Sequence, residues 1–324
     1  MGTLDTVEEP LLPSCVASFA AQRSFTLPMP GLDDEEGPHL PEALPPVVDA
    51  HVHLFPDRLF DAIWKWFDTF GWPIRYRLRA PDVISFLFAR GVERIVALHY
   101  AHRPGIARGM NKFVAELSRS DPRIVGVATV FPGEPGATAI LEEAFAEGLS
   151  GVKLHSHVQC VAADDAPVHE VYEACARAGK PVIIHAGREP TSPGYACDPH
   201  KICGVSRIEA ALRDHPGCKI VVPHLGADEL DGYMGLLEKY DNLWLDTTMA
   251  IADYLPLAVP PRMLTMRPDR VLFGTDFPNL PYAWDREIKQ LLGMKLPEET
   301  LATLLGGAAT ALYGLQPVKT SAGV

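Results

Sequence analysis

The pattern of apolar and polar positions changes character near residue 46. Before that point prolines interrupt every candidate helix, at Pro10, Pro13, Pro28, Pro30, Pro38, Pro41 and Pro45. From Pro81 onward, short apolar runs of strand length alternate with amphipathic stretches of helix length. The pattern therefore predicts an irregular, acidic, proline-rich N-terminal extension over residues 1–45 and one large domain over residues 46–324.

The large domain repeats a strand followed by helical sequence eight times. The expected strands are Val47–His51, Arg94–His99, Ile124–Val130, Gly151–His155, Val182–His185, Lys219–His224, Leu243–Asp246 and Val271–Asp276. The main expected helices are Asp82–Arg90, Ile106–Ser118, Ala137–Glu147, Val168–Ala178, Ser206–Asp214, Asp228–Tyr240, Trp284–Leu292 and Glu298–Tyr313. Several strands are apolar on both faces, as strands covered by helices must be. Eight such units predict an α/β fold, the closed (β/α)₈ barrel of the TIM type.

An aromatic stretch, Phe55–Trp72, follows the first expected strand. It contains Trp64, Trp66, Phe67 and Trp72 at a spacing that suits a helix. Its place after the first strand makes it a candidate lid over the barrel mouth. Plain hydrophobic packing explains the same residues equally well, because aromatic side chains also dominate cores.

Composition and charge limit the classes of partner. Apolar residues make up 47% of the chain and charged residues 22%, as in an ordinary globular protein with a large core. The net charge is -12, which argues against nucleic acid, and no run of about 20 apolar residues exists to cross a membrane. Six cysteines without a Cys-x-x-Cys pair suggest reduced thiols in a cytoplasmic protein. A small-molecule substrate is the expected partner, and a homo-oligomer is possible.

Histidines and one aspartate stand where the expected strands end. His51 and His53 share one face of the first strand, because side chains alternate along a strand. The other strand-end residues are His155, His185, His224 and Asp276. In a (β/α)₈ barrel the carboxyl ends of all strands meet at one mouth, and imidazole and carboxylate groups suit zinc. Because these residue types recur at so many strand ends, a metal site is a better interpretation than capping residues that stand there by chance.

Five motifs resemble those of the amidohydrolase superfamily, and more closely its amidohydrolase-related branch, which includes hydrolases and metal-dependent non-oxidative decarboxylases. They are Asp49-Ala50-His51-Val52-His53, Gly151-Val152-Lys153-Leu154-His155, Val182-Ile183-Ile184-His185-Ala186-Gly187, Val222-Pro223-His224-Leu225-Gly226 and Phe273-Gly274-Thr275-Asp276-Phe277-Pro278. The resemblance covers about residues 47–315 and leaves the extension out. Together the motifs are specific for fold and metal, and they say little about the substrate.

The resemblance implies a role for each of these residues. His51, His53, His185 and Asp276 would hold one divalent metal, with zinc the first expectation and manganese the second. His224 would join a second metal or, in single-metal members, orient and polarise the substrate. Asp276 and His224 are thus the expected catalytic residues, with Asp276 moving a proton from the activated water to the leaving group.

Other candidates near the predicted site are less defined. A lysine at the place of Lys153 is carboxylated in two-metal relatives, but pairing with an acid away from the metal is the favoured interpretation here. His155 and His157 could touch a second metal or the substrate. Arg188 could grip a substrate carboxylate or remain a solvated loop residue. Asp49 could hold an imidazole or make a hydrogen bond in the core.

These residues favour a metal-dependent hydrolase that cleaves an amide, lactone or ester-like bond with a metal-activated water. The alternative is a metal-dependent decarboxylase of a small aromatic or unsaturated acid. A carboxylated Lys153 and two metals would favour hydrolysis, whereas one metal leaves both reactions open. A barrel used only for binding is disfavoured, because every expected ligand position is filled.

Overall fold

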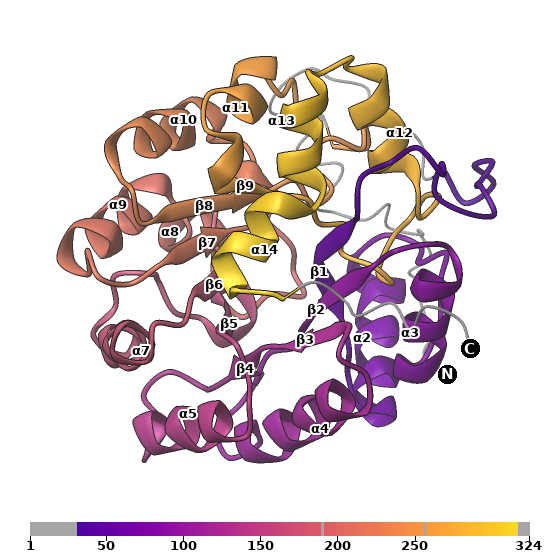
Figure 1. Ribbon diagram of the computed structural model, residues 1–324. Helices are drawn as coiled ribbons and strands as arrows, with labels where there is room; N and C mark the ends of the chain where they lie inside the picture. Colours follow the sequence, from indigo (N-terminus) through magenta and orange to yellow (C-terminus); the bar gives the residue numbers. More distant parts are fainter. Residues whose placement is uncertain (1–30, 189–190, 256, 317–324) are drawn as a thin grey trace, which may run out of the picture.

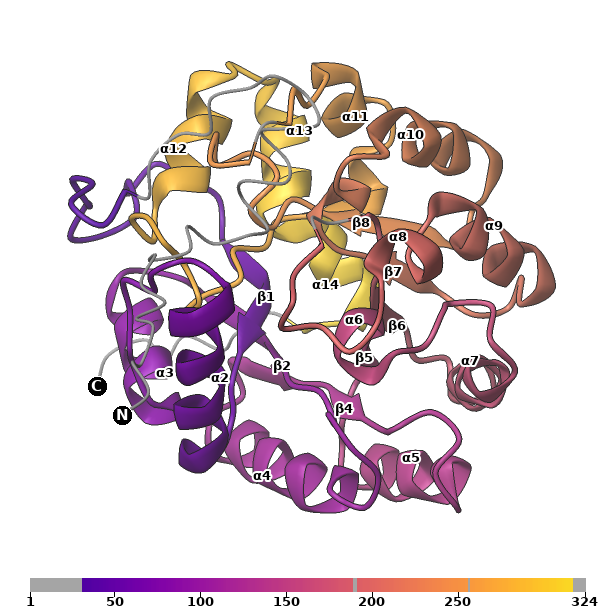
Figure 2. The ribbon, with the colours of Figure 1, turned by 180° about the vertical axis from the view of Figure 1, so that it is seen from behind.

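The computed structural model describes residues 31–188, 191–255 and 257–316 and shows a parallel β-barrel surrounded by helices (Figures 1 and 2). Its strands are β1 (Val48–His53), β2 (Arg94–Leu98), β3 (Ile124–Gly126), β4 (Ala128–Thr129), β5 (Val152–His155), β6 (Val182–His185), β7 (Ile220–Val222), β8 (Leu243–Asp246) and β9 (Val271–Leu272). Every strand pair is parallel. Because β3 and β4 are two pieces of one barrel strand, the fold is the predicted (β/α)₈ barrel.

Helices follow the strands and cover the outside of the barrel. The longer ones are α2 (Asp57–Phe70), α3 (Ala80–Ala89), α4 (Ala107–Ser120), α5 (Ala137–Ala146), α7 (Ala166–Ala178), α9 (Val205–Asp214), α10 (Leu230–Lys239) and α12 (Arg286–Gly293). Short helices are α6 (Ser156–Gln159), α8 (Pro199–Ile202), α11 (Pro261–Thr265), α13 (Glu298–Ala302) and α14 (Ala308–Tyr313). Two short 3₁₀ helices, η1 (His224–Gly226) and η2 (Pro268–Arg270), and one π-helical turn, η3 (Thr303–Gly307), complete the set.

Backbone hydrogen bonds just beyond β9 join the last strand to the first. The ladder orders are β1-β2-β3 and β4-β5-β6-β7-β8-β9. The amide of Ala50 donates to Phe273 O at 2.8 Å, and the amide of Asp276 donates to His51 O at 2.9 Å. These bonds hold the segment that carries Asp276 against the strand that carries two histidines.

The interior of the barrel is apolar at one end and polar at the other. Along β2, Ile95 and Ala97 belong to the core under the helices, whereas Val96 and Leu98 belong to the core inside the barrel. Such alternation is what a strand buried on both faces requires. Helix α14 adds Ala308, Ala309 and Leu312 to the inner core, at the end of the barrel that faces the viewer in Figure 1.

Two expected strands end well before the residue that the sequence predicted, whereas Arg94–His99 and Ile124–Val130 each end one residue early. The expected strand Lys219–His224 ends at Val222, and the expected strand Val271–Asp276 ends at Leu272. His224 (φ 57°) and Asp276 (φ 76°) instead adopt left-handed backbone conformations that a strand cannot contain. The last expected helix is also divided, because residues 303–307 form a π-helical turn between α13 and α14.

The described part of the N-terminal extension lies against the barrel. The carboxylate of Asp34 pairs with Arg286 at 3.2 Å, and the amide of Gly37 donates to Asp285 Oδ2 at 2.8 Å. The indole of Trp284 donates to Gly37 O at 3.1 Å. Residues 31–37 therefore brace the loop between β9 and α12. Residues 1–30 of the predicted extension, including Cys15, fall outside the described residues.

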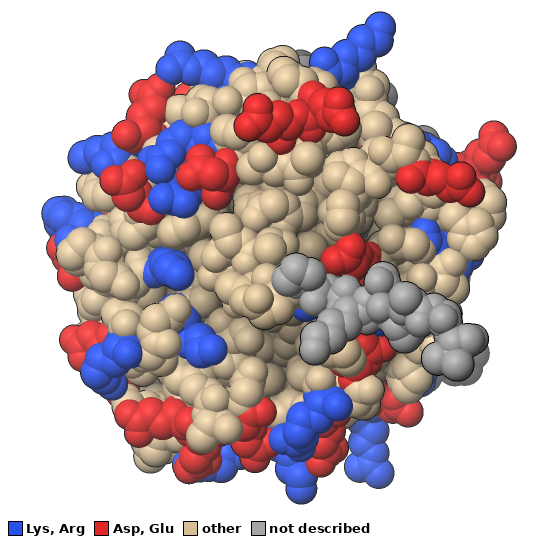
Figure 3. Space-filling model, in the orientation of Figure 1, with Lys and Arg blue, Asp and Glu red and all other residues tan. Residues whose placement is uncertain are grey.

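One face of the molecule carries charges of both signs. In Figure 3, lysine and arginine side chains alternate with acidic ones around the rim of the face that α14 crosses. No wide field of positive charge occupies this face. Within the described ranges, none of the helices is long and apolar enough to span a bilayer.

A buried histidine ties β2 to the neighbouring elements and makes a pH effect testable. His99 Nε2 lies 3.1 Å from Asn111 Oδ1, and Asn111 also accepts from the amide of Thr129. Burial lowers the pKa of His99 from 6.5 to about 4. Between pH 6.5 and 4 the unfolded chain therefore binds a proton here that the folded chain does not, so stability is lost as the pH falls.

We expect His99→Gln to weaken this pH dependence, because glutamine does not titrate and can still donate to Asn111. The difference between wild type and variant in the unfolding free energy should change by roughly 3 kcal/mol between pH 7 and pH 4. Denaturant unfolding of metal-free protein across this range measures it. Parallel curves for the two proteins would show that His99 is not the group responsible.

Candidate metal centre

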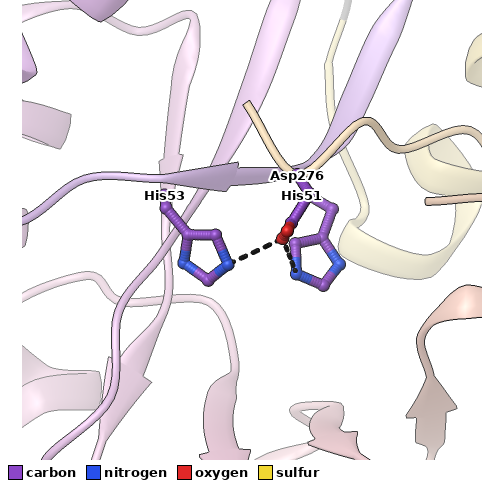
Figure 4. A group of neighbouring side chains, drawn as sticks. All are labelled: His51, His53 and Asp276. Carbon is purple, nitrogen blue, oxygen red and sulfur yellow. Dashed lines mark hydrogen bonds and ion pairs between the residues drawn. The ribbon is translucent and has the colours of Figure 1, made fainter. Parts of the chain in front are cut away.

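Two histidines of β1 and one aspartate after β9 form the centre of the candidate site. The Nε2 atom of His53 lies 2.9 Å from Asp276 Oδ1, and the Nε2 atom of His51 lies 3.4 Å from the same oxygen. All three side chains are buried, and one ligand atom of each lies within 4.8 Å of the others. Figure 4 shows the carboxylate between the two imidazoles. The structure thus brings together three of the four residues predicted as ligands of one metal.

Asp246, at the end of β8, fixes the orientation of His51. Its Oδ2 lies 2.8 Å from His51 Nδ1, and its Oδ1 accepts from the backbone amides of His224 and Thr248. Because an ionised carboxylate only accepts, the proton of His51 sits on Nδ1 and Nε2 presents a lone pair to the cluster. Asp246 was not among the predicted site residues, although it ends a predicted strand just as the others do.

The remaining strand-end histidines lie next to this cluster. The ring of His224 is 5.8 Å from that of His51 and 4.6 Å from that of His185. His224 Nδ1 lies 2.9 Å from Thr248 O, so Nδ1 is the donor, and its buried Nε2 has no hydrogen-bond partner among the described residues. His185 stacks on His155 at 4.2 Å. His185 is adjacent to the three-residue group without being part of it, so its role as a ligand stays a prediction.

Burial and neighbouring charges set the protonation states in the cluster. Burial and the charge of Lys153 lower the pKa of His51 to about 4. For Asp276, burial works against ionisation, but His53, His51 and His224 together hold its pKa well below the usual range. A neutral imidazole and an ionised carboxylate are the forms that a cation needs as ligands.

The backbone around Asp276 is shaped to reach the barrel axis. Gly274 lies against β1, and a Cβ atom there would stand 2.8 Å from His51 Cβ, which no side chain tolerates. Asp49 accepts from the hydroxyl of Thr275 at 2.6 Å and from its amide at 3.1 Å. Asp49 therefore makes the core hydrogen bonds that were one of its two predicted roles, and these position the segment before Asp276.

A cavity of about 330 Å³ opens beside the cluster. Helix α2 contributes Leu59, Ala62, Ile63, Trp66 and Phe67, and the other lining residues are Tyr100, His102, His155, His157, Val158, Gly194, Tyr195 and Ala196. The ring of Tyr100 lies 5.9 Å from that of His53, which connects the cavity to the cluster. The predicted aromatic stretch forms helix α2, with Trp66 and Phe67 on the cavity and Trp64 in the core, so both cavity lining and core packing use its side chains.

Lys153 and Arg188 lie in different surroundings. Lys153, on β5, is fully buried, and its charge lowers the pKa of His51, so it stands within electrostatic reach of the cluster. Arg188 pairs with Asp228 at 3.3 Å and with Glu229 at 3.5 Å, and it does not line the cavity. The guanidinium is therefore engaged by two carboxylates, and a contact with a substrate carboxylate stays a prediction.

The donor set fits a divalent cation. Two imidazole nitrogens and one carboxylate oxygen converge, and three such ligands with an open position are typical of catalytic zinc sites. His51 also has the hydrogen bond to a carboxylate behind it that ligating histidines usually have.

A family model describes almost the whole barrel. The model for amidohydrolases matches residues 48–315, from the first residue of β1 to one residue before the end of the described chain. The chain belongs to the amidohydrolase family. Members of this family are metal-dependent enzymes that act on small molecules, and they include hydrolases and decarboxylases.

A curated protein shares part of the sequence of this chain. A 6-methylsalicylic acid decarboxylase of Penicillium expansum is 31% identical over 118 residues. That match covers 32% of this chain and 36% of the relative, so the chain spans about a third of the length of the curated relative that it matches.

Solved structures of low sequence identity show the same fold. A 5-carboxyvanillate decarboxylase of Novosphingobium aromaticivorans, complexed with manganese and a nitrobenzoic acid, is 15% identical with a TM-score of 0.58, covering 86% of this chain and 99% of that one. A protein assigned as a 2-pyrone-4,6-dicarboxylic acid hydrolase, from Pseudomonas putida, is 18% identical with a TM-score of 0.55, covering 83% and 97%.

The N-terminal segment offers a test of where the functional groups of this amidohydrolase lie. A chain that begins at Gly31 is expected to keep metal and turnover, because no predicted site residue lies before Asp49. A chain that begins at Leu44 should instead lose stability, since Asp285 and Trp284 lose their partners, at about 1–3 kcal/mol for each buried polar group. Thermal unfolding and metal content are measured for both. If the chain from Gly31 folds and holds metal but has no turnover, the extension contributes to the site.

Proposed function

We propose that this protein is a metal-dependent, non-oxidative decarboxylase of a small aromatic acid. The observation that carries the proposal is the aromatic and apolar cavity that opens directly beside the metal-ligand cluster. A planar ring can lie between Trp66 and Phe67 of α2 and Tyr195 of the facing loop, with its carboxylate toward His51, His53 and Asp276. The local likeness to a 6-methylsalicylic acid decarboxylase supports the same substrate class.

A hydrogen bond and ring contacts hold the aromatic wall of the cavity, Trp66 and Tyr195, in place. The indole of Trp66 donates to Gly194 O at 3.2 Å and lies 5.3 Å from the ring of Tyr195. Tyr195 in turn lies 5.2 Å from the ring of His157. These contacts would keep water from one side of the cavity and hold the ring of an aromatic substrate in one plane. A substrate held in a fixed orientation reacts faster.

His51, His53 and Asp276 would hold the metal, with His185 as the fourth ligand and zinc or manganese as the ion. A bound dication supplies the positive charge that holds the substrate carboxylate and polarises a neighbouring oxygen. His224 would orient that oxygen through Nε2, because Nδ1 is committed to Thr248 O. Asp276, ionised in the metal-free site, would take a proton from a water molecule and pass it to the ring carbon that bears the carboxylate. The carbon–carbon bond then breaks, carbon dioxide leaves, and the bonding electrons return to the ring.

Hydrolysis of a lactone, amide or ester-like bond is the second candidate. Lys153 is the residue that would favour it, because Lys153 is buried within electrostatic reach of His51 and the family resemblance implies a carboxylated, metal-bridging lysine at this place in two-metal hydrolases. The same cluster would then serve attack by water, with Asp276 accepting its proton. Mass spectrometry of intact Lys153 peptides and a count of metal per chain separate the two arrangements.

A substitution that fills the cavity tests the proposed binding mode. Ala62 is exposed on α2 and lines the cavity, so Ala62→Trp should occupy the space for the ring without disturbing the core. We expect kcat/KM for an aromatic acid to fall about 10–100-fold with metal content unchanged. Lys65→Trp, on the same helix but outside the cavity lining, is the matched control. Equal kinetics for both variants would place the substrate elsewhere.

A further inference from the structure

Two cysteines from separate loops meet behind the wall of the cavity. Cys160 directly follows α6, and Cys197 lies just before Asp198, the residue that caps α8. Helices α6 and α8 are in contact and lie side by side at the mouth of the barrel (Figure 2). No motif in the sequence indicates this pairing, because the two cysteines lie far apart without a common pattern.

The two thiols share one acceptor and contact each other. Both donate to the carbonyl oxygen of His157, Cys160 Sγ at 3.8 Å and Cys197 Sγ at 3.4 Å. They also lie within hydrogen-bonding distance of one another. Cys160 is exposed and Cys197 half-buried, so small reagents reach the pair from solvent. The other cysteines in the described part of the chain, Cys175, Cys203 and Cys218, are buried.

We propose that Cys160 and Cys197 are a redox-active pair that a hydroperoxide oxidises to an intramolecular disulfide. The exposed Cys160 thiolate attacks the peroxide, the O–O bond breaks, and a sulfenic acid forms on Cys160 with release of an alcohol or water. The sulfur of Cys197 then attacks that of Cys160, the S–S bond forms, the S–O bond breaks, and water leaves. The two sulfurs together lose two electrons, which reduce the peroxide.

The order of attack follows from the surroundings of each sulfur. Burial and the contact with Cys160 raise the pKa of the Cys197 thiol, so Cys197 reacts more slowly with a peroxide and attacks second, and its proton leaves with the oxygen of the sulfenic acid as water. Cys160, open to solvent at the end of α6, meets the oxidant first.

The disulfide would join two walls of the cavity. His157 and Val158 of α6 line one side, and Gly194, Tyr195 and Ala196 line the other. Cys160 and Cys197 follow these two groups in the chain, so a disulfide between them would hold the two walls at a fixed distance. Oxidation would therefore act on the cavity mouth without touching a metal ligand, and it does not depend on which reaction the protein catalyses.

The test uses reduced, metal-loaded, full-length protein treated with a small excess of hydrogen peroxide. Remaining thiols are then alkylated in denaturant and the peptides are analysed by mass spectrometry. We expect two of the six thiols to be lost, and one new species to appear in which the Cys160 and Cys197 peptides are joined with the loss of two hydrogens. A reductant should restore both thiols. The peptides of Cys175, Cys203 and Cys218 serve as internal controls and should remain alkylated.

Two variants separate the steps. In Cys197→Ser, Cys160 should stop at the sulfenic acid, which dimedone traps, and in Cys160→Ser the Cys197 thiol should survive peroxide. Full alkylation of both cysteines in oxidised wild-type protein would overturn the proposal, and so would a link from either of them to a different cysteine.

Discussion

Replacing Asp276 with asparagine is expected to lower turnover per bound metal by about 10²–10⁴-fold, the usual effect of losing a positioned proton carrier. Asparagine keeps the size of the side chain and an oxygen that can face the cation, but it removes the negative charge and cannot take or give the proton. The fold should persist, because Asp276 stands at the barrel mouth, where groups serve chemistry more than packing. Turnover at saturating metal, divided by measured metal content, gives the result.

His51→Ala is the comparison for this variant. It removes a ligand but no proton carrier, so its main effect should be a lower metal content, with turnover per bound metal less affected. If Asp276→Asn turns over normally per metal, the proton travels through another group. His224 is then the next candidate, since its Nε2 is buried beside the cluster.

Asp246→Ala is expected to weaken metal binding by roughly 10–100-fold, although Asp246 is not itself proposed as a ligand. Its carboxylate keeps the His51 proton on Nδ1 and also accepts from the amide of His224. Without it, the imidazole of His51 is free to turn or to move its proton to Nε2, the atom that faces the cluster. Titration of metal-free protein with zinc or manganese measures the change in affinity.

Glu134→Ala is the matched control for the Asp246 variant. Glu134 is also a buried carboxylate that accepts from two backbone amides, those of Gly105 and Phe131, but it contacts no residue of the cluster. We expect it to lower the unfolding temperature and leave metal affinity unchanged. A loss of metal affinity in both variants would mean that Asp246 acts through general stability rather than through His51.

The barrel could be predicted from the sequence because its strands have a simple local signal. Strands β6 and β8 have the predicted bounds, Val182–His185 and Leu243–Asp246, since short apolar runs between helices admit few other structures. The convergence of His51, His53 and Asp276 followed from the rule that strand ends meet at the barrel mouth. The same rule applied to Asp246 would have identified it as well.

Other features depend on contacts that the local sequence does not contain. The positive φ angles of His224 and Asp276 exclude both residues from the predicted strands, and hydrogen bonds from their backbone amides to Asp246 and His51 hold this strained backbone in place. Helices α6 and α8 have four residues each, too few for a periodic pattern. The approach of Cys197 to Cys160 depends on how these two helices pack, which no spacing of cysteines reveals.

Removal of a carboxylate from an aromatic acid at the metal centre can be tested directly by isotope incorporation. Small hydroxylated aromatic acids and lactones are followed with metal-loaded protein in D₂O and, in parallel, in H₂¹⁸O, with chelator-treated protein as control. We expect release of carbon dioxide, one deuterium on the ring carbon that bore the carboxylate, no ¹⁸O in the aromatic product, and no reaction after chelation. Incorporation of one ¹⁸O into a ring-opened product without release of carbon dioxide would contradict it and establish hydrolysis instead.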